Sequence, residues 1–307
     1  MKLKETLVGL VAALTIGGVG SGCLAIRTLP YEGPPGMPHR TTREYENNNN
    51  SLDDDSFDEV MRSVEMIRVS ADYLIQSPFI AVPENPDASE EDTNNNNIQE
   101  LRTSGSGIVL FRHNGYDYVL TNFHVVNIPD VFNDFFWTAQ RVSEPEISIG
   151  EIHGIEMVYH NEHLDSALLR VPRNDASYPL TQNNSLYMGD SNSIRIGDFL
   201  CAVGYSLGAG NFLTQGSITN LGEFELDYTW PFTIPTDNVF LFQTPISPGN
   251  SGGPLLTVDD GNMYLVGFTM GYLNGLGNNV GIRINEIMED IVESNIEIPI
   301  RLYRDSR

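Results

Sequence analysis

Cysteine and lysine are scarce in this chain of 307 residues, which has two cysteines and a total of 17 lysines and arginines. Both lysines, Lys2 and Lys4, lie in the first five residues, so every later cation is an arginine. Two cysteines cannot form a disulfide framework. Cys201 lies in an apolar stretch and is expected to be a buried, small hydrophobic residue. His153, His160 and His163 are close in sequence, but their spacing matches no zinc-binding pattern, so they are expected to be surface residues and the sequence predicts no metal site.

Positive charge is also scarce. The chain has 41 acidic residues against those 17 basic ones, which gives a formal net charge of −24. Nucleic acids and anionic lipid headgroups are bound by positively charged surfaces. The charge therefore argues against a nucleic-acid partner and against direct docking on a membrane surface. It fits either a salty habitat, where repulsion is screened, or simply a soluble acidic protein.

The N-terminal apolar segment, residues 6–20, is shorter than the roughly 20 residues of a comfortable transmembrane helix. Behind its two lysines it indicates a secretory signal peptide over residues 1–22. Cys23 directly follows small residues, as at a bacterial lipoprotein cleavage site, and is the predicted lipidation site. Cleavage to a freely secreted form is the alternative. The protein is expected to be exported to the cell envelope, periplasm or outer surface, and to reach the membrane only through this anchor.

Composition separates a tether from a globular part. Residues 23–55 are rich in proline, glycine, asparagine and charged residues, which predicts a disordered tether. Residues 57–67 have helical spacing and predict a short N-terminal helix, and residues 282–292 predict a C-terminal helix. A long loop is expected over residues 77–103.

One segment points to chemistry, the heptapeptide Pro248-Gly249-Asn250-Ser251-Gly252-Gly253-Pro254. Its glycines let the backbone turn sharply and approach a substrate closely. Backbone N–H groups of Gly249 and Ser251 could then face one spot beside the Ser251 hydroxyl. Acyl-transfer enzymes need this arrangement, a nucleophile next to donors for an oxyanion. The alternative is a loop between two strands with an incidental serine.

A serine nucleophile needs a base, and the base needs an orienting acid. His124 directly follows a strongly β-prone run and precedes further apolar residues, so it can be held rigidly and still face a cleft. His113 is beside an Asn-Gly turn and is expected to be solvated. Asp165 immediately precedes an apolar strand, so its carboxylate should be partly buried and need a partner. Taken alone, Asp165 would more often be surface charge.

Three segments together resemble the trypsin-like serine peptidases, and most of all the bacterial HtrA/Deg branch. They are Thr-Asn-Phe-His-Val-Val at 121–126, Asp-Ser-Ala-Leu-Leu at 165–169 and Gly-Asn-Ser-Gly-Gly-Pro at 249–254. Their order, His, Asp, Ser, is that of the chymotrypsin fold. The resemblance implies an all-β protein with two antiparallel six-stranded β-barrels, over about residues 56–175 and 185–300, and an active site between them.

The resemblance also implies a serine endopeptidase that works through an acyl-enzyme, without a cofactor, on protein or peptide substrates. Ser251 would attack the carbonyl, His124 would carry the proton, and Asp165 would orient the imidazole. Gly249, Asn250 and Ser251 would form the oxyanion hole. A homo-oligomer is an open alternative, because family members often form trimers.

Departures from the family pattern leave the specificity open. Pro245 stands six residues before Ser251, where trypsin has an aspartate, which argues against a pocket for arginine or lysine. Phe268, Thr269 and Met270 are expected to line the cleft and to favour a small or apolar side chain. No PDZ domain is expected after the catalytic domain.

Two rival functions use the same fold. One is a catalytically silent binding protein, and the other is a protease that stays latent until its loops order. The intact set of His124, Asp165 and Ser251 argues against the silent protein.

Overall fold

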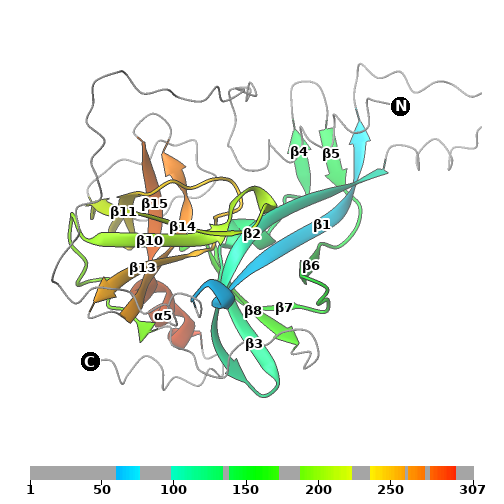
Figure 1. The fold of residues 1–307 in the computed structure, drawn as a ribbon. Helices are drawn as coiled ribbons and strands as arrows, with labels where there is room; N and C mark the ends of the chain where they lie inside the picture. Colours follow the sequence, from blue (N-terminus) through cyan, green and yellow to red (C-terminus); the bar gives the residue numbers. More distant parts are fainter. Residues whose placement is uncertain are drawn as a thin grey trace, which may run out of the picture.

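The computed structural model describes residues 60–76, 98–133, 138–172, 187–222, 236–259, 262–273 and 277–294. The predicted signal peptide, the tether and Cys23 lie outside these residues. The described part is built mainly of strands, in two sheets that lie side by side (Figure 1).

The first sheet holds eight antiparallel strands: β1 (Val64–Gln76), β2 (Ile98–His113), β3 (Tyr116–Thr121), β4 (Val131–Asn133), β5 (Thr138–Arg141), β6 (Glu146–Ile149), β7 (Glu156–Asn161) and β8 (Ser166–Pro172). Six of them follow one another in the order β6-β1-β2-β3-β8-β7. The hairpin β4–β5 is added at the far end of β1, where β5 pairs with Tyr73–Gln76.

The second sheet holds seven strands: β9 (Tyr187–Met188), β10 (Phe199–Tyr205), β11 (Asn211–Asn220), β12 (Val239–Gln243), β13 (Pro254–Asp259), β14 (Asn262–Leu273) and β15 (Asn278–Arg283). Strands β10 to β15 close into a ring, because β13 pairs with both β10 and β14. The short β9 adds to β14 in parallel. The predicted all-β architecture of two barrels is confirmed, with short strands added to each.

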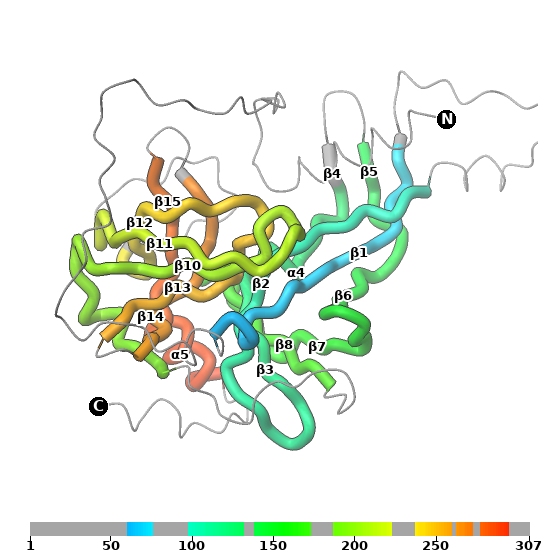
Figure 2. Tube along the Cα trace, viewed as in Figure 1, coloured from blue at the N-terminus to red at the C-terminus, as the bar shows by residue number. Residues whose placement is uncertain are grey.

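Apolar side chains fill each sheet and also join the two. One cluster is confined to the first sheet and another to the second. A third combines Leu120 and Leu168 of the first sheet with Phe268 of the second and Ile287 of α5 (Ile284–Glu293). Figure 2 shows β1 and β2 passing alongside β10 where the sheets meet. Residues at this junction are therefore positioned by one continuous apolar interface.

The turn and the helix that were predicted from short sequence patterns are present in the structure. Asn114 and Gly115 both have positive φ, 50° and 82°, so the turn between β2 and β3 forms as predicted. The predicted C-terminal helix is confirmed as α5, which buries Ile284, Ile287 and Ile291. Within the described ranges, no helix has the length and apolar character needed to cross a membrane.

Two boundaries were wrong. The N-terminal helix ends at Ser63, because Val64 already pairs with Ile108 as the start of β1. The expected loop over residues 77–103 is too long at its C-terminal end, since Ile98 begins β2 and pairs with Leu74. In both places strand pairing outweighs the local sequence pattern.

Candidate active site

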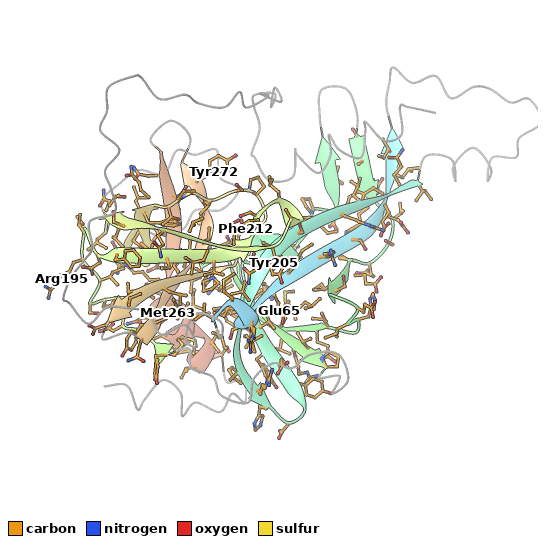
Figure 3. The ribbon with its side chains drawn as sticks, in the orientation of Figure 1. Glu65, Arg195, Tyr205, Phe212, Met263 and Tyr272 are labelled. Atoms are coloured by element: carbon orange, nitrogen blue, oxygen red, sulfur yellow. The ribbon has the colours of Figure 1, made fainter. Side chains whose placement is uncertain are left out.

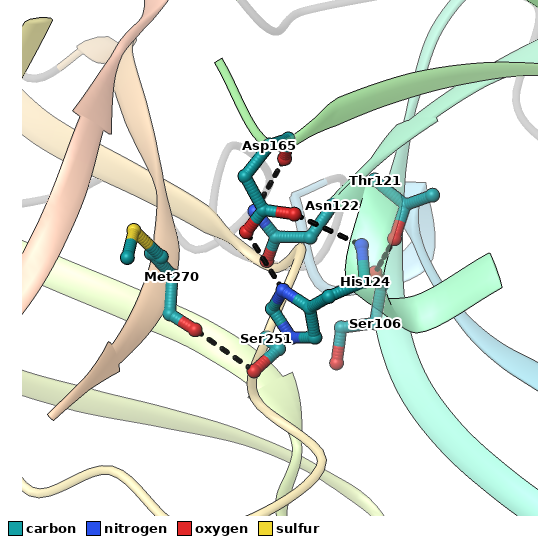
Figure 4. Close-up of polar contacts among 7 residues, drawn as sticks. All are labelled: Ser106, Thr121, Asn122, His124, Asp165, Ser251 and Met270. Atoms are coloured by element: carbon teal, nitrogen blue, oxygen red, sulfur yellow. Dashed lines mark hydrogen bonds and ion pairs between the residues drawn. The ribbon is translucent and has the colours of Figure 1, made fainter. Parts of the chain in front are cut away.

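His124 lies in α4 (Phe123–Val126), a single helical turn that follows β3. Its ring Nδ1 is 2.7 Å from Oδ2 of Asp165, and its backbone N–H donates to Oδ1 of the same carboxylate over 2.9 Å (Figure 4). Asp165 is fully buried, whereas 27% of the His124 side chain is exposed. A carboxylate at Nδ1 fixes the tautomer that carries its proton there. Nε2, on the opposite side of the ring, is then the basic nitrogen.

Asp165 closes the turn of residues 162–165 in a left-handed backbone conformation, with φ of 42°. This region is uncommon for residues other than glycine, although aspartate tolerates it better than most. The Asp165 carbonyl accepts the Phe123 N–H over 3.1 Å and the Asn122 side-chain amide over 3.0 Å. Backbone and side chain of Asp165 are thus both tied to α4 and its N-terminal flank.

Ser251 lies in the turn between β12 and β13, partly exposed. Its hydroxyl donates to the Met270 carbonyl over 3.1 Å, and no hydrogen bond joins it to His124 in the described structure. The segments that carry Ser251 and His124 are nevertheless close together. Gly252 lies so near the residue at the start of α4 that a Cβ placed on it would be 3.1 Å from the backbone nitrogen of Asn122. Figure 4 shows the Ser251 side chain beside the imidazole. A change of Ser251 rotamer would redirect the hydroxyl without moving the backbone.

The peptide before Gly249 has a fixed orientation. The Pro248 carbonyl accepts the Leu207 N–H over 2.7 Å, and Leu207 belongs to η1 (Ser206–Gly208). In a trans peptide the carbonyl and the N–H point in opposite directions, so the Gly249 N–H faces away from η1. Gly249 has φ of 99°, and a Cβ there would lie 2.2 Å from the Tyr205 carbonyl oxygen, so this position requires glycine.

The peptide before Ser251 is oriented in the same manner. The Asn250 carbonyl accepts the Gly253 N–H over 2.9 Å, which turns the Ser251 N–H to the other side. In the described part of the chain, nothing accepts a hydrogen bond from the N–H groups of Gly249 or Ser251. The Asn250 N–H, in contrast, donates to the Ser247 carbonyl over 3.0 Å. Of the three predicted oxyanion donors, the N–H groups of Gly249 and Ser251 are therefore available. The Asn250 N–H instead stabilises the loop through its hydrogen bond to Ser247.

Ser106 of β2 connects the first sheet to this loop, and the sequence analysis did not identify it. Its N–H donates to the Ser251 carbonyl and its Oγ to the Gly249 carbonyl, each over 2.7 Å. The same Oγ accepts the Tyr205 N–H over 2.8 Å. Ser106 is fully buried. The signal in the sequence is its position between Gly105 and Gly107. In the structure a Cβ on Gly105 would lie 2.5 Å from Val125, so the backbone beside Ser106 is closely packed.

The three residues expected to line the cleft have buried side chains, with Phe268 0%, Thr269 1% and Met270 1% exposed. A bulge between Thr269 and Gly271 interrupts the pairing of β14 with β15. Phe268 and Met270 pack into the cluster that joins the sheets. What reaches the site from this segment is the Met270 carbonyl, through its hydrogen bond with Ser251.

The remaining candidate side chains lie elsewhere. His153, His160 and His163 are exposed, as expected, and His160 stacks on Phe123 with ring centroids 4.9 Å apart. Among the described residues, no three histidine, cysteine or acidic side chains are grouped to hold a metal ion. Cys201 is fully buried, and burial raises the pKa of its thiol to about 11. The prediction that Cys201 is a buried, small hydrophobic residue is confirmed.

Comparison with known families gives the same assignment. Residues 105–267 match the model of the trypsin-like peptidase domain, a range that includes His124, Asp165 and Ser251. The chain belongs to the trypsin-like peptidase family. The resemblance to the trypsin-like serine peptidases stated from its motifs is confirmed.

Two of these trypsin-like relatives come from Escherichia coli K12. The periplasmic pH-dependent serine endoprotease DegQ is 32% identical over 184 residues, covering 60% of this chain and 34% of DegQ. The periplasmic serine endoprotease DegP is 30% identical over 186 residues, covering 60% and 33%. The chain thus spans about a third of these relatives. The solved structure of the HtrA-type protease AlgW with a decapeptide has a TM-score of 0.49 and 20% identity, covering 78% of this chain and 66% of AlgW.

Proposed function

We propose that this chain is a serine endopeptidase that hydrolyses protein or peptide substrates through an acyl-enzyme at Ser251. One observation carries the proposal, the buried Asp165 bound to His124 beside the Ser251 loop. The available N–H groups of Gly249 and Ser251 support it, because they lie on the loop that carries the proposed nucleophile. Family membership supports the reaction class.

The reaction begins with the Ser251 hydroxyl turning from the Met270 carbonyl to Nε2 of His124. His124 takes the hydroxyl proton while Oγ bonds to the substrate carbonyl carbon. The carbonyl electrons move onto oxygen, and this oxyanion is stabilised by the N–H groups of Gly249 and Ser251. When the tetrahedral adduct collapses, the C–N bond breaks and His124 returns the proton to the leaving amine. Water then hydrolyses the ester by the same steps. Removing one oxyanion donor typically raises the barrier by about 2.7–4 kcal/mol.

The test is covalent labelling by a fluorophosphonate together with casein hydrolysis, at low and high salt. Ser251→Ala should abolish both. Ser247→Ala is the matched control, because it removes a hydroxyl from the same loop but leaves the proposed machinery intact, and it should retain both. Undiminished labelling of Ser251→Ala would refute the assignment of the nucleophile.

A latent protease is the second candidate, because the Ser251 hydroxyl is bound to the Met270 carbonyl and not to His124. Turnover of a fluorogenic peptide library without any additive would reject latency. Turnover that appears only after a peptide or protein is added would establish it. A chain with neither turnover nor labelling under any condition would instead be the silent binding protein.

We further propose export to the cell envelope, with lipidation of Cys23 after cleavage behind residue 22. The support is the cationic, apolar N-terminal sequence and the periplasmic location named for the relatives. Mass spectrometry of the mature N-terminus should find diacylglycerol on Cys23, and Cys23→Ala should release the protein from the membrane fraction. A mature N-terminus without lipid would reject the anchor.

A further inference from the structure

The helix α5 makes a polar contact with the first sheet through Asp290. Oδ2 of Asp290 accepts the Tyr159 hydroxyl over 2.5 Å and the Asn161 side-chain amide over 2.9 Å, both from β7. Burial and the hydrogen bond to Asp290 raise the pKa of Tyr159, which keeps its hydroxyl protonated as a donor. Asp290 lies near the C-terminal end of α5, where the helix dipole disfavours a carboxylate. Helix stability therefore does not explain this residue, whereas its two donors do.

Asn161 is also hydrogen-bonded to the turn that carries Asp165. Its side-chain oxygen accepts the N–H of His163 over 2.8 Å and the N–H of Leu164 over 3.1 Å. The turn is closed by the Asp165 N–H, which donates to the Glu162 carbonyl over 3.3 Å. With its amide nitrogen on Asp290 and its oxygen on the turn, Asn161 has little freedom to rotate. The route from α5 to Asp165 thus consists of hydrogen bonds and one short turn.

We propose that Asp290 is a positioning residue for the catalytic acid, acting through Asn161 to hold the turn in which Asp165 faces His124. The left-handed backbone of Asp165 makes such support necessary, because an unsupported turn would relax to a commoner conformation. The kinetic consequence rests on the proposed peptidase function. The geometric consequence, an ordered Asp165–His124 pair, does not.

The competing explanation is that Asp290 only docks α5 on the first sheet. Apolar contacts already provide docking, because Ile287 and Ile291 of α5 share a buried cluster with Tyr159 and Leu164. Pure docking predicts lower stability without a change at His124. Positioning predicts a change at His124 in a protein that is still folded.

The experiment compares Asp290→Ala with Glu289→Ala, which removes an equal charge from the exposed neighbouring position of the same helix. We expect Asp290→Ala to lower kcat by about 10- to 100-fold, as for small misplacements of a catalytic group, with KM nearly unchanged. Asp290→Asn, which keeps an acceptor oxygen, should give an intermediate kcat. Glu289→Ala should match the parent protein. Thermal unfolding of each variant identifies those that fold, and Asp290→Asn serves if Asp290→Ala does not.

A second measurement does not depend on turnover. The hydrogen-bonded Nδ1 proton of His124, assigned by its loss in His124→Ala, should give a far-downfield NMR resonance in the parent protein. It should shift or broaden in Asp290→Ala and stay in place in Glu289→Ala. In an Asn161→Ala background, the effect of Asp290→Ala should vanish, because the connection is already cut.

An unchanged resonance together with a kcat equal to that of Glu289→Ala would overturn the positioning role. A parent protein without fluorophosphonate labelling would count against the proposed function, and the NMR comparison would still decide the role of Asp290.

Discussion

The proposed acid–base pair and the loop of the proposed nucleophile are held in different ways. Asp165 and His124 both lie in connections beside strands of the first sheet, and their segments contact one another through backbone and side chain. The loop of Ser251 connects two strands of the second sheet. It is held by hydrogen bonds to residues outside the loop, Ser106 of β2 in the first sheet and Leu207 of η1, which follows β10. In this structure Asp165 and His124 are hydrogen-bonded to one another, while the Ser251 hydroxyl donates to the Met270 carbonyl.

The orientation of His124 thus depends on Asp165 and its turn and, as proposed above, on Asp290 of α5, whereas the orientation of the Ser251 loop depends on Ser106, where β2 meets that loop. Changes to the Asp165 turn should therefore act on the proposed base. Changes to Ser106 should act on the loop.

The largest effect is expected from Asp165→Asn. The substitution keeps the shape of the side chain but favours the wrong imidazole tautomer, which in a serine triad lowers kcat by about 10⁴-fold. Hydrolysis of a peptide substrate at constant pH measures the loss, and circular dichroism checks the fold. A loss under about tenfold would show that the pair is not the working base.

The next prediction concerns the pH dependence of the stability that the first sheet contributes. Glu65, near the start of β1 (Figure 3), is 5% exposed, and its pKa is raised to about 7, chiefly by burial and also by Asp117, against the opposing charge of Arg112. The ordinary pKa of this carboxyl group is 4.5. Between that pH and about pH 7, the folded protein therefore holds a proton on Glu65 that the unfolded chain has lost. Stability contributed by protonated Glu65 falls as the pH rises through this window, by at most about 3 kcal/mol.

Glu65→Gln should remove this pH dependence. Urea unfolding of both proteins at pH 5 and pH 8 measures it, with the parent losing more stability than the variant on going to pH 8. Equal losses in the two proteins would show that Glu65 is charged or accessible in the folded state.

A smaller effect is expected from Ser106→Ala, which removes the hydroxyl that donates to the buried Gly249 carbonyl and accepts the Tyr205 N–H. An unsatisfied buried group costs about 1–3 kcal/mol. We expect a fall in kcat of about tenfold or more, with the His124 Nδ1 resonance unchanged because the Ser106 side chain bonds to Gly249 and Tyr205 and not to the Asp165–His124 pair. A shift of that resonance would break the distinction between the two halves of the site.

The smallest effect is expected from Leu207→Gly. Leu207 has φ of 53° and a side chain that is mostly exposed, and its proposed contribution is its N–H. Glycine adopts this φ readily and keeps the N–H. Activity should stay within about twofold, as for most surface changes. A large loss would show that the side chain itself orders the loop.

Short-range patterns in the sequence were sufficient to propose His124 and Ser251, because a strand end and a glycine turn mark them locally. Asp165 needed the family resemblance, because taken alone it would more often be surface charge. The contacts that support them were not predictable. Ser106 and Gly249 are 143 residues apart, and Asn161 and Asp290 are 129 apart. No periodicity or turn preference relates such positions. Which face of β14 turns to the core was not predictable either, and the side chains of Phe268 and Met270 lie in the cluster that joins the sheets.

The most direct measurement is mass spectrometric mapping of the fluorophosphonate adduct in the parent protein and in His124→Ala. The proposed site predicts an adduct on Ser251 in the parent and its loss in His124→Ala. An adduct on another residue, or equally fast modification of Ser251 without His124, would contradict it.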